Sequence, residues 1–239
     1  PNYLEQTGYP TSNMLPQENI NNDLRQGFDF SVYGNKKFGE WDLTLGVSGM
    51  YYTTEATQRD EVIAIGNEYT SRVGKPLNAI WGLESDGFIT SKDQISDTPE
   101  EATSTKLNYK LGQDPTIGDL KYIDQNGDNI IDEHDEVFLG RSDTPFRLGL
   151  NFTAKYKNWT LFVMGNGYFG GYGLKNSSYY WVHSDRKYSE VVRGRWTPET
   201  AATATFPRLT ATNGAHSFRN SDFWLYKADR FNLSQIQVT

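Results

Sequence analysis

One segment of the sequence carries side chains of the kind that bind metal ions, the acidic run 124–135. An EF-hand-type calcium loop has side-chain oxygens at positions 1, 3, 5, 9 and 12 and a backbone carbonyl at position 7. The matching residues are Asp124, Asn126, Asp128, Ile130 (through its carbonyl), Asp132 and Asp135. Because Ca²⁺ prefers roughly six to eight hard oxygen ligands, the spacing predicts a calcium site, and oxygen-only ligation excludes zinc or copper as its natural occupant.

Two positions of this run depart from the calcium pattern. Position 6 is Asn129 where the pattern has Gly, which is acceptable because Asn tolerates a positive φ. Position 12 is Asp135 in place of Glu, so bidentate ligation is less assured. The alternative is an acidic turn in solvent whose side chains bond to their own backbone. Since the flanks are β-like, an ion here would hold the loop in shape rather than act as a sensor.

A second candidate site is aromatic. Tyr179, Tyr180 and Trp181, together with Trp196, form an aromatic cluster in a polar segment. Such rings stack on sugars or peptide side chains, or pack against a partner protein. The alternative is that they fix a long loop onto itself, and the sequence does not separate the two.

No residue pattern favours catalysis. The chain has no Cys, which excludes thiol catalysis and Cys-ligated zinc. Its three histidines (His134, His183 and His216) are scattered without metal-ligand spacing. There is no Gly-x-Ser-x-Gly motif, and the Gly pairs lack the Lys of a phosphate loop. We therefore predict that the chain is not an enzyme; a glycan-processing enzyme is the weakest alternative.

The elements that must position these residues are strands. From Phe146 to Tyr156 apolar and polar residues alternate, as they do from Trp159 to Phe169, from Phe28 to Tyr33 and from Trp41 to Tyr52. A period of two is typical of a strand with one apolar and one polar face. Turns are predicted around Asn35–Glu40 and at Lys157-Asn158, so the strands form two hairpins.

The hairpins are separated by two long polar segments, 54–143 and 170–220. Short turns at one end and long loops at the other are the layout of an outer-membrane barrel. Aromatic residues lie where interfacial girdles would fall: Trp41, Tyr51, Tyr52, Tyr156, Trp159, Tyr168 and Phe169. The alternative is a soluble β-sandwich, whose strands are shorter on average.

Composition agrees with this interpretation. The 239 residues carry a net charge of −7, which argues against nucleic-acid binding. No segment approaches the roughly 20 apolar residues of a transmembrane helix, but a barrel carries its apolar surface on alternate residues only. The chain begins at Pro1 and ends within a predicted strand, 232–239, so we expect an interior piece of a longer protein.

Four motifs follow one another along the chain. The first two are Val73-Gly74-Lys75-Pro76-Leu77 with Trp81-Gly82 and Asp86-Gly87-Phe88, and Gly118-Asp119-Leu120-Lys121-Tyr122 with Asp124 to Asp128, Ile131-Asp132 and Gly140. The last two are Trp196-Thr197-Pro198 with Ala204-Thr205-Phe206-Pro207-Arg208-Leu209, and Phe223-Trp224-Leu225 with Arg230-Phe231-Asn232-Leu233. In this order and spacing they resemble the motifs of SusC/RagA-type TonB-dependent transporters, and the fourth departs most from the family pattern. Together the motifs cover nearly the whole chain, from about residue 25 to 239.

The resemblance implies an all-β chain, 1–239, that is a late portion of a large antiparallel transmembrane β-barrel, 22-stranded in the family, with long extracellular loops. The plug, the TonB box and the final strands would lie outside it. The implied function is TonB-dependent import of oligosaccharides or peptides across the outer membrane of a Gram-negative bacterium, with a SusD-like surface lipoprotein as a lid. The two long loops would contribute to the lid contact.

The alternative from another class is a soluble calcium-braced β module that binds glycan at a cell surface. The direction of the strand faces separates the two hypotheses. In a transporter Phe146, Leu148, Leu150 and Phe152 face lipid, whereas Arg147, Asn151 and Lys155 face a polar lumen. In a soluble module the apolar set would instead pack into a closed core. Glycan and peptide remain open as substrates.

Overall fold

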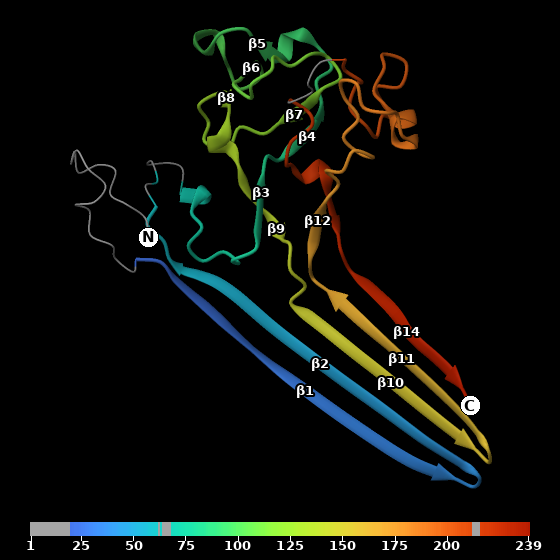
Figure 1. Cartoon of the computed structure of the whole chain (residues 1–239). Coiled ribbons are helices and arrows are strands. Elements are labelled where there is room, and N and C mark those ends of the chain that lie inside the picture. Colours follow the sequence, from blue (N-terminus) through green and yellow to red (C-terminus); the bar gives the residue numbers. More distant parts are fainter. Residues whose placement is uncertain (1–19, 62, 64–67, 212–215) are drawn as a thin grey trace.

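The computed structural model describes residues 20–61, 63, 68–211 and 216–239. It has two parts, a long inclined sheet and a lobe of shorter elements at one end of that sheet (Figure 1). Within the described residues, no helix is long and apolar enough to cross a membrane.

Five antiparallel strands form the long sheet in the order β1-β2-β10-β11-β14. Their bounds are β1 (Asn22–Phe38), β2 (Trp41–Gln58), β10 (Phe146–Tyr156), β11 (Trp159–Phe169) and β14 (Arg230–Val238). The predicted hairpins are confirmed, and both of their turns lie at the end of the sheet away from the lobe (Figure 1). The sheet is open, with β1 and β14 at its edges.

Both hairpin turns have two residues, Gly39-Glu40 and Lys157-Asn158. Their first residues have positive φ, 59° at Gly39 and 53° at Lys157, as tight hairpin turns with right-handed strand twist require. The first turn is shorter than the predicted Asn35–Glu40, because β1 continues to Phe38.

The strand register separates the sheet into one apolar and one polar face. Residues directly opposite each other in a sheet share a face, and Phe152 lies opposite both Leu45 of β2 and Val163 of β11. The apolar face comprises Phe28, Phe30, Val32, Leu43, Leu45, Val47, Phe146, Leu148, Leu150, Phe152, Leu161, Val163, Phe231, Leu233, Ile236 and Val238. A bulge in β14 opposite Met164 and Gly165 keeps Ile236 and Val238 on this face.

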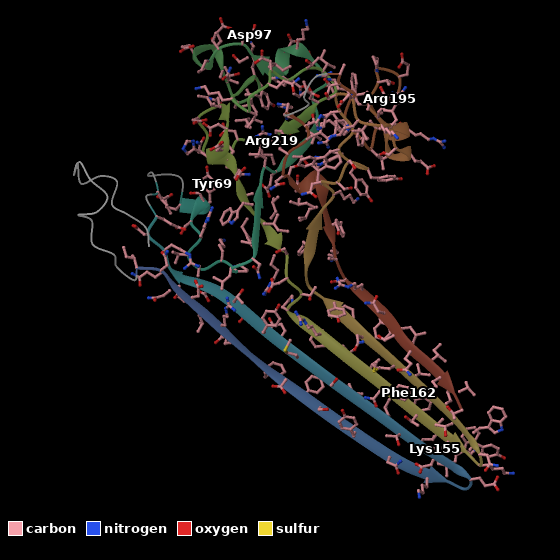
Figure 2. All side chains as sticks on the ribbon, viewed as in Figure 1. Tyr69, Asp97, Lys155, Phe162, Arg195 and Arg219 are labelled. Carbon is pink, nitrogen blue, oxygen red and sulfur yellow. The ribbon has the colours of Figure 1, made fainter. Side chains whose placement is uncertain are left out.

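The opposite face carries the polar set. It includes Arg147, Asn151 and Lys155, as predicted, and Lys155 lies close to the hairpin end (Figure 2). The girdle prediction is wrong, however, for two of its seven residues. Tyr52 and Tyr168 are on the polar face, since each is an odd number of residues from its apolar neighbour Tyr51 or Phe169. The other five proposed girdle residues are on the apolar face.

The lobe is built from two insertions between the long strands, 59–145 and 170–229, and we call it the loop lobe. β2 overlaps the start of the predicted loop 54–143, since it continues to Gln58. The short strands are β3 (Ala79–Gly82), β4 (Ser85–Phe88), β5 (Ile95–Ser96), β6 (Leu107–Tyr109), β7 (Leu120–Tyr122), β8 (Ile130–Ile131), β9 (Val137–Arg141), β12 (Tyr172–Leu174) and β13 (Leu225–Lys227).

Short 3-10 helices complete the lobe: η3 (Glu68–Thr70), η4 (Lys92–Gln94), η5 (Pro99–Glu101), η6 (Glu133–Asp135), η7 (Glu190–Gly194) and η8 (Asp222–Trp224). Two antiparallel ribbons, β3–β9 and β12–β13, connect the lobe to the sheet, and we call them the stalks (Figure 1). The stalks touch: a methyl group on Gly140 of β9 would come 2.9 Å from Tyr172 Cδ2 of β12.

Two hydrophobic cores stabilise the loop lobe. The first belongs to insertion 59–145 and contains Leu83, Ile89, Leu107, Tyr109, Leu111, Leu120, Tyr122 and Ile131. The second belongs to insertion 170–229 and contains Val182, Val192, Phe206, Phe218 and Trp224. Phe223 packs against both cores, with its ring 5.9 Å from that of Phe88 and 4.9 Å from that of Trp224. The two insertions therefore fold as one unit.

We expect Leu120→Ala to destabilise the loop lobe by about 3 kcal/mol, because Leu120 is fully buried and the change leaves a cavity. Hydrogen exchange of the complete protein should become faster in β4, β6 and β7 but not in β10. The exposed Val73→Ala is the control and should leave exchange unchanged. Equal exchange in Leu120→Ala and the wild type would contradict the assignment of this core.

Candidate functional site

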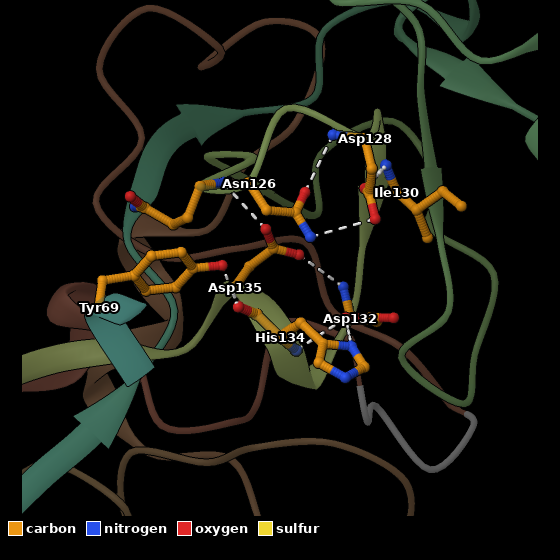
Figure 3. A network of polar contacts seen from close by, with 8 residues as sticks. Tyr69, Asn126, Asp128, Ile130, Asp132, His134 and Asp135 are labelled. Carbon is orange, nitrogen blue, oxygen red and sulfur yellow. Dashed lines mark hydrogen bonds and ion pairs between the residues drawn. The ribbon is translucent and has the colours of Figure 1, made fainter. Parts of the chain in front are cut away.

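The predicted calcium loop is ordered by its own acidic side chains (Figure 3). Asp124 accepts the backbone N–H groups of Gly127 and Asn129, each at 2.7 Å. Asn126 accepts from Asp128 N at 2.9 Å, and Asp128 accepts from Ile130 N at 2.7 Å. Asn129 has a φ of 63°, as its place in the pattern predicts. These Asx turns hold the loop in shape.

The end of the loop is fixed by Asp135, which is fully buried. Its two carboxylate oxygens accept Gln125 N at 2.9 Å and Asp132 N at 2.8 Å, so it links both ends of the loop. Burial raises the pKa of Asp135, the two backbone hydrogen bonds lower it, and the charges of Asp124 and Asp132 raise it further. Asp132 caps η6 by accepting from His134 N at 2.7 Å.

Tyr69 of η3 covers this loop and donates its hydroxyl hydrogen to the carbonyl of His134 (Figure 3). Burial, followed by the charges of Asp135 and the other loop aspartates, raises the pKa of Tyr69 to about 12. The aspartates are therefore close enough to act on one phenol. Nevertheless, no three His, Asp or Glu side chains in the described ranges converge as metal ligands would. The calcium site stays a prediction.

The aromatic cluster is divided between surface and interior. Trp181 and Tyr180 pack against the second core, with the Trp181 ring 6.4 Å from that of Trp224. Trp196 covers Gly118, where an added methyl group would come 2.5 Å from its Cε3 atom. Tyr179 is 49% exposed. Three of the four rings thus stabilise the lobe itself, and contact with substrate or partner stays a prediction for the set.

The junction between the two insertions is a buried polar network that the sequence did not reveal. Asp119 forms an ion pair with Arg208 at 3.0 Å and accepts a hydrogen bond from Ser217 Oγ at 3.1 Å. The Ser217 hydroxyl oxygen in turn accepts Leu120 N at 3.0 Å, and Arg208 N donates to Gly118 O at 2.9 Å. Two of the resemblance motifs, one in each insertion, therefore contact each other directly.

His216 completes this network. Its Nε2 atom lies 2.8 Å from the Leu120 carbonyl, so Nε2–H donates, while its own carbonyl accepts the Tyr122 hydroxyl at 2.9 Å. The ring lies against those of Tyr109 and Tyr122. Its Nδ1 atom is buried and has no hydrogen-bond partner in the described part of the chain. Burial lowers the pKa of His216, because a second proton would be placed on this unpartnered nitrogen.

The fold defines a segment of antiparallel barrel-type sheet that carries a large folded loop region. No family model matches the chain. The chain is similar to TonB-dependent receptor P26 of Formosa agariphila, with 31% identity over 153 residues, covering 62% of this chain and 14% of that protein. Its structure is similar to one titled the RagAB peptide transporter, with a TM-score of 0.64 and 16% identity, covering 95% of this chain and 24% of that chain.

These comparisons support the resemblance to SusC/RagA-type transporters and the all-β barrel fold. At 16% identity the solved structure shows the fold alone. The chain spans well under a third of either relative, so the activity of a whole protein does not follow from the match. Neither printed name describes an enzyme, which supports the prediction that this chain is not one.

We expect acid to loosen the loop lobe through His216. Above its ordinary pKa of 6.5 the imidazole is neutral in both folded and unfolded chains, and its contribution to stability is complete. As pH falls below 6.5 the unfolded chain binds a proton that the folded lobe resists, so stability decreases. The protection factors of β7, which are the exchange rates of the unfolded chain divided by those of the folded protein at the same pH, should therefore fall between pH 7 and 5, and His216→Gln should reduce that dependence. A flat pH profile in the wild type would contradict the assignment.

Proposed function

We propose that the chain is part of a transporter that imports oligosaccharides or peptides across the outer membrane of a Gram-negative bacterium, powered through TonB. The observation that carries the proposal is the apolar face, which runs in register across five long strands and, among the described residues, belongs to neither hydrophobic core. At the edge strands Phe28, Val32 and Ile236 are 62, 64 and 62% exposed. In this proposal the apolar face contacts lipid and the polar face lines the lumen.

The loop lobe suits an extracellular role in this proposal. It lies at the end of the sheet opposite the short turns, which is where barrels of this kind have their longer extracellular loops (Figure 1). We propose that it contributes to the contact with a SusD-like surface lipoprotein, and that the exposed Tyr179 belongs to the contacting surface. TonB would act on the N-terminal region of the whole transporter.

We expect the complete parent protein to fractionate with the outer membrane and to migrate differently on gels before and after heating. Uptake of its substrate should fall to background in cells that lack TonB, because the transport step is driven from the inner membrane. Clean release into buffer without detergent would contradict the proposal and favour a soluble calcium-braced module that binds glycan. Hydrolysis of a glycan by the purified protein would favour an enzyme.

We also propose that the loop 124–135 binds Ca²⁺ as a structural ion. Its donor set fits the ion, because every candidate ligand is an oxygen of Asp124, Asn126, Asp128, Ile130, Asp132 or Asp135. The four candidate ligand carboxylates of this short loop repel each other unless a cation neutralises them, in line with the aspartate charges that raise the pKa of Asp135. Binding would require these side chains to lie closer together than the structure places them.

We expect millimolar CaCl₂ to raise the melting temperature of the loop lobe relative to chelator, consistent with an affinity on the order of 10⁻⁴–10⁻³ M for extracellular modules. Asp124→Ala should abolish the calcium-dependent shift and weaken lid docking, whereas barrel assembly should be unaffected. The exposed Asp97→Ala is the matched control. Loss of basal stability in Asp124→Ala is expected from its two backbone hydrogen bonds alone, so only the calcium-dependent difference tests the ion.

A further inference from the structure

A shallow trough of about 380 Å³ lies on the polar face of the long sheet, next to the loop lobe. It spans two adjacent rows of side chains and the backbone between them. One row contains the small residues Ser31, Ser48 and Gly149, which make the depression. The other row contains Met50, Arg147 and Tyr168 and continues to Arg230 on β14. Among the described residues that line the trough, Asp29 is the one acidic side chain.

The second row brings two positive charges to opposite sides of one ring. Tyr168 lies between Arg147 on β10 and Arg230 on β14 in the strand register. The Arg230 guanidinium carbon is 4.5 Å from the centre of the Tyr168 ring, and that of Arg147 is 5.9 Å away. Arg147 is also 5.8 Å from the Tyr52 ring. Cation–π contact fixes the plane of a guanidinium while its N–H groups remain able to donate.

A third arginine, Arg141, also contacts the Tyr52 ring, and its partner is a carboxylate. Arg141 lies 5.8 Å from the Tyr52 ring and binds the Asp143 carboxylate through Nε and Nη2, each at 2.6 Å. Both carboxylate oxygens of Asp143 accept a hydrogen bond in this pair. Arg147 and Arg230 are exposed, and within the described ranges neither forms an ion pair or a side-chain hydrogen bond. Two like charges held around one ring repel each other, and a bound anion would relieve this.

We propose that Arg147 and Arg230, positioned by Tyr168, form a subsite that binds a carboxylate group of the transported solute while its neutral part lies in the trough. This rests on the proposed transport function, in which the polar face lines the lumen. A guanidinium held in one orientation can donate two parallel hydrogen bonds, and this geometry favours a planar carboxylate as its partner. Arg141 binds the Asp143 carboxylate in this way. The carboxylate can come from an acidic peptide or from a uronate sugar.

The test is binding by the complete parent transporter in detergent, with a hexaglutamate peptide and a trigalacturonate as acidic probes. A hexaglutamine peptide and a neutral trisaccharide are the matched neutral probes. Arg147→Gln and Arg230→Gln should each weaken binding of an acidic probe by about tenfold or more. Lys155→Gln, which removes a charge from the same face at the far end of β10, should change it less than about twofold. Arg147→Lys should bind the acidic probe more tightly than Arg147→Gln but more weakly than the wild type, because lysine keeps the charge and loses the bidentate hydrogen bonding of the guanidinium.

An effect on hexaglutamate alone identifies peptide as the source of the carboxylate, and an effect on trigalacturonate alone identifies sugar. The proposal is overturned if the wild type binds neither acidic probe, if neutral probes lose affinity equally, or if Lys155→Gln weakens binding as much. Heat-dependent gel migration of each variant establishes that the barrel is assembled. TonB-dependent uptake by the wild type tests the transport function separately. If the wild type takes up solute but the two arginine variants bind the acidic probes normally, the subsite proposal is overturned and the transport proposal stands.

Discussion

The pairing of β2 with β10 is the constraint on which the rest of the structure depends. These strands are distant in sequence, yet Tyr51 lies opposite Phe146 and Tyr52 N donates to Pro145 O at 3.0 Å. The insertion 59–145 must therefore leave and re-enter the sheet at one point. The pairing of β11 with β14 likewise requires the insertion 170–229 to leave and re-enter the sheet at one point. There Ala228 N donates a hydrogen bond to Gly171 O at 2.9 Å. Because both insertions stand on neighbouring strand ends, they pack against each other and bury two cores that touch through Phe223.

The sequence predicted those features that depend on local periodicity. The alternation of residue types around Phe152 predicts that it lies on the apolar face of its strand. The strand register of the structure then places it beside apolar residues of the neighbouring strands. The same rule explains the error at Tyr52 and Tyr168. Both were assigned to a girdle from their position near a strand end, whereas the parity of their position puts them on the polar face. Asn129 is a further local success, because its φ of 63° follows from its place in the loop pattern.

The junction between the insertions could not be predicted in this way. Nothing near Asp119 or Arg208 in the sequence indicates that they form an ion pair or that the Asp119 side chain is buried. The sequence showed only that His216 lacks metal-ligand spacing, and nothing near it indicates that it is one of the most buried side chains of the lobe. The motifs around 118–122 and 196–209 did carry the relevant signal, since their residues meet at Gly118 and Trp196. Their contact, however, depends on strand pairing far from both.

The two stalks have a mechanical consequence. A lobe on one two-stranded ribbon could twist about that ribbon, since a single hairpin resists torsion weakly. Here β3–β9 and β12–β13 stand together, touch at Gly140 and Tyr172, and are joined above by the lobe and below by the sheet. Such a closed four-strand frame transmits torque: a force that displaces one insertion must bend both ribbons and shift the ends of β2, β10, β11 and β14 together. Load applied to the outer surface of the lobe would therefore reach the wall of the sheet as a tilt of the whole frame.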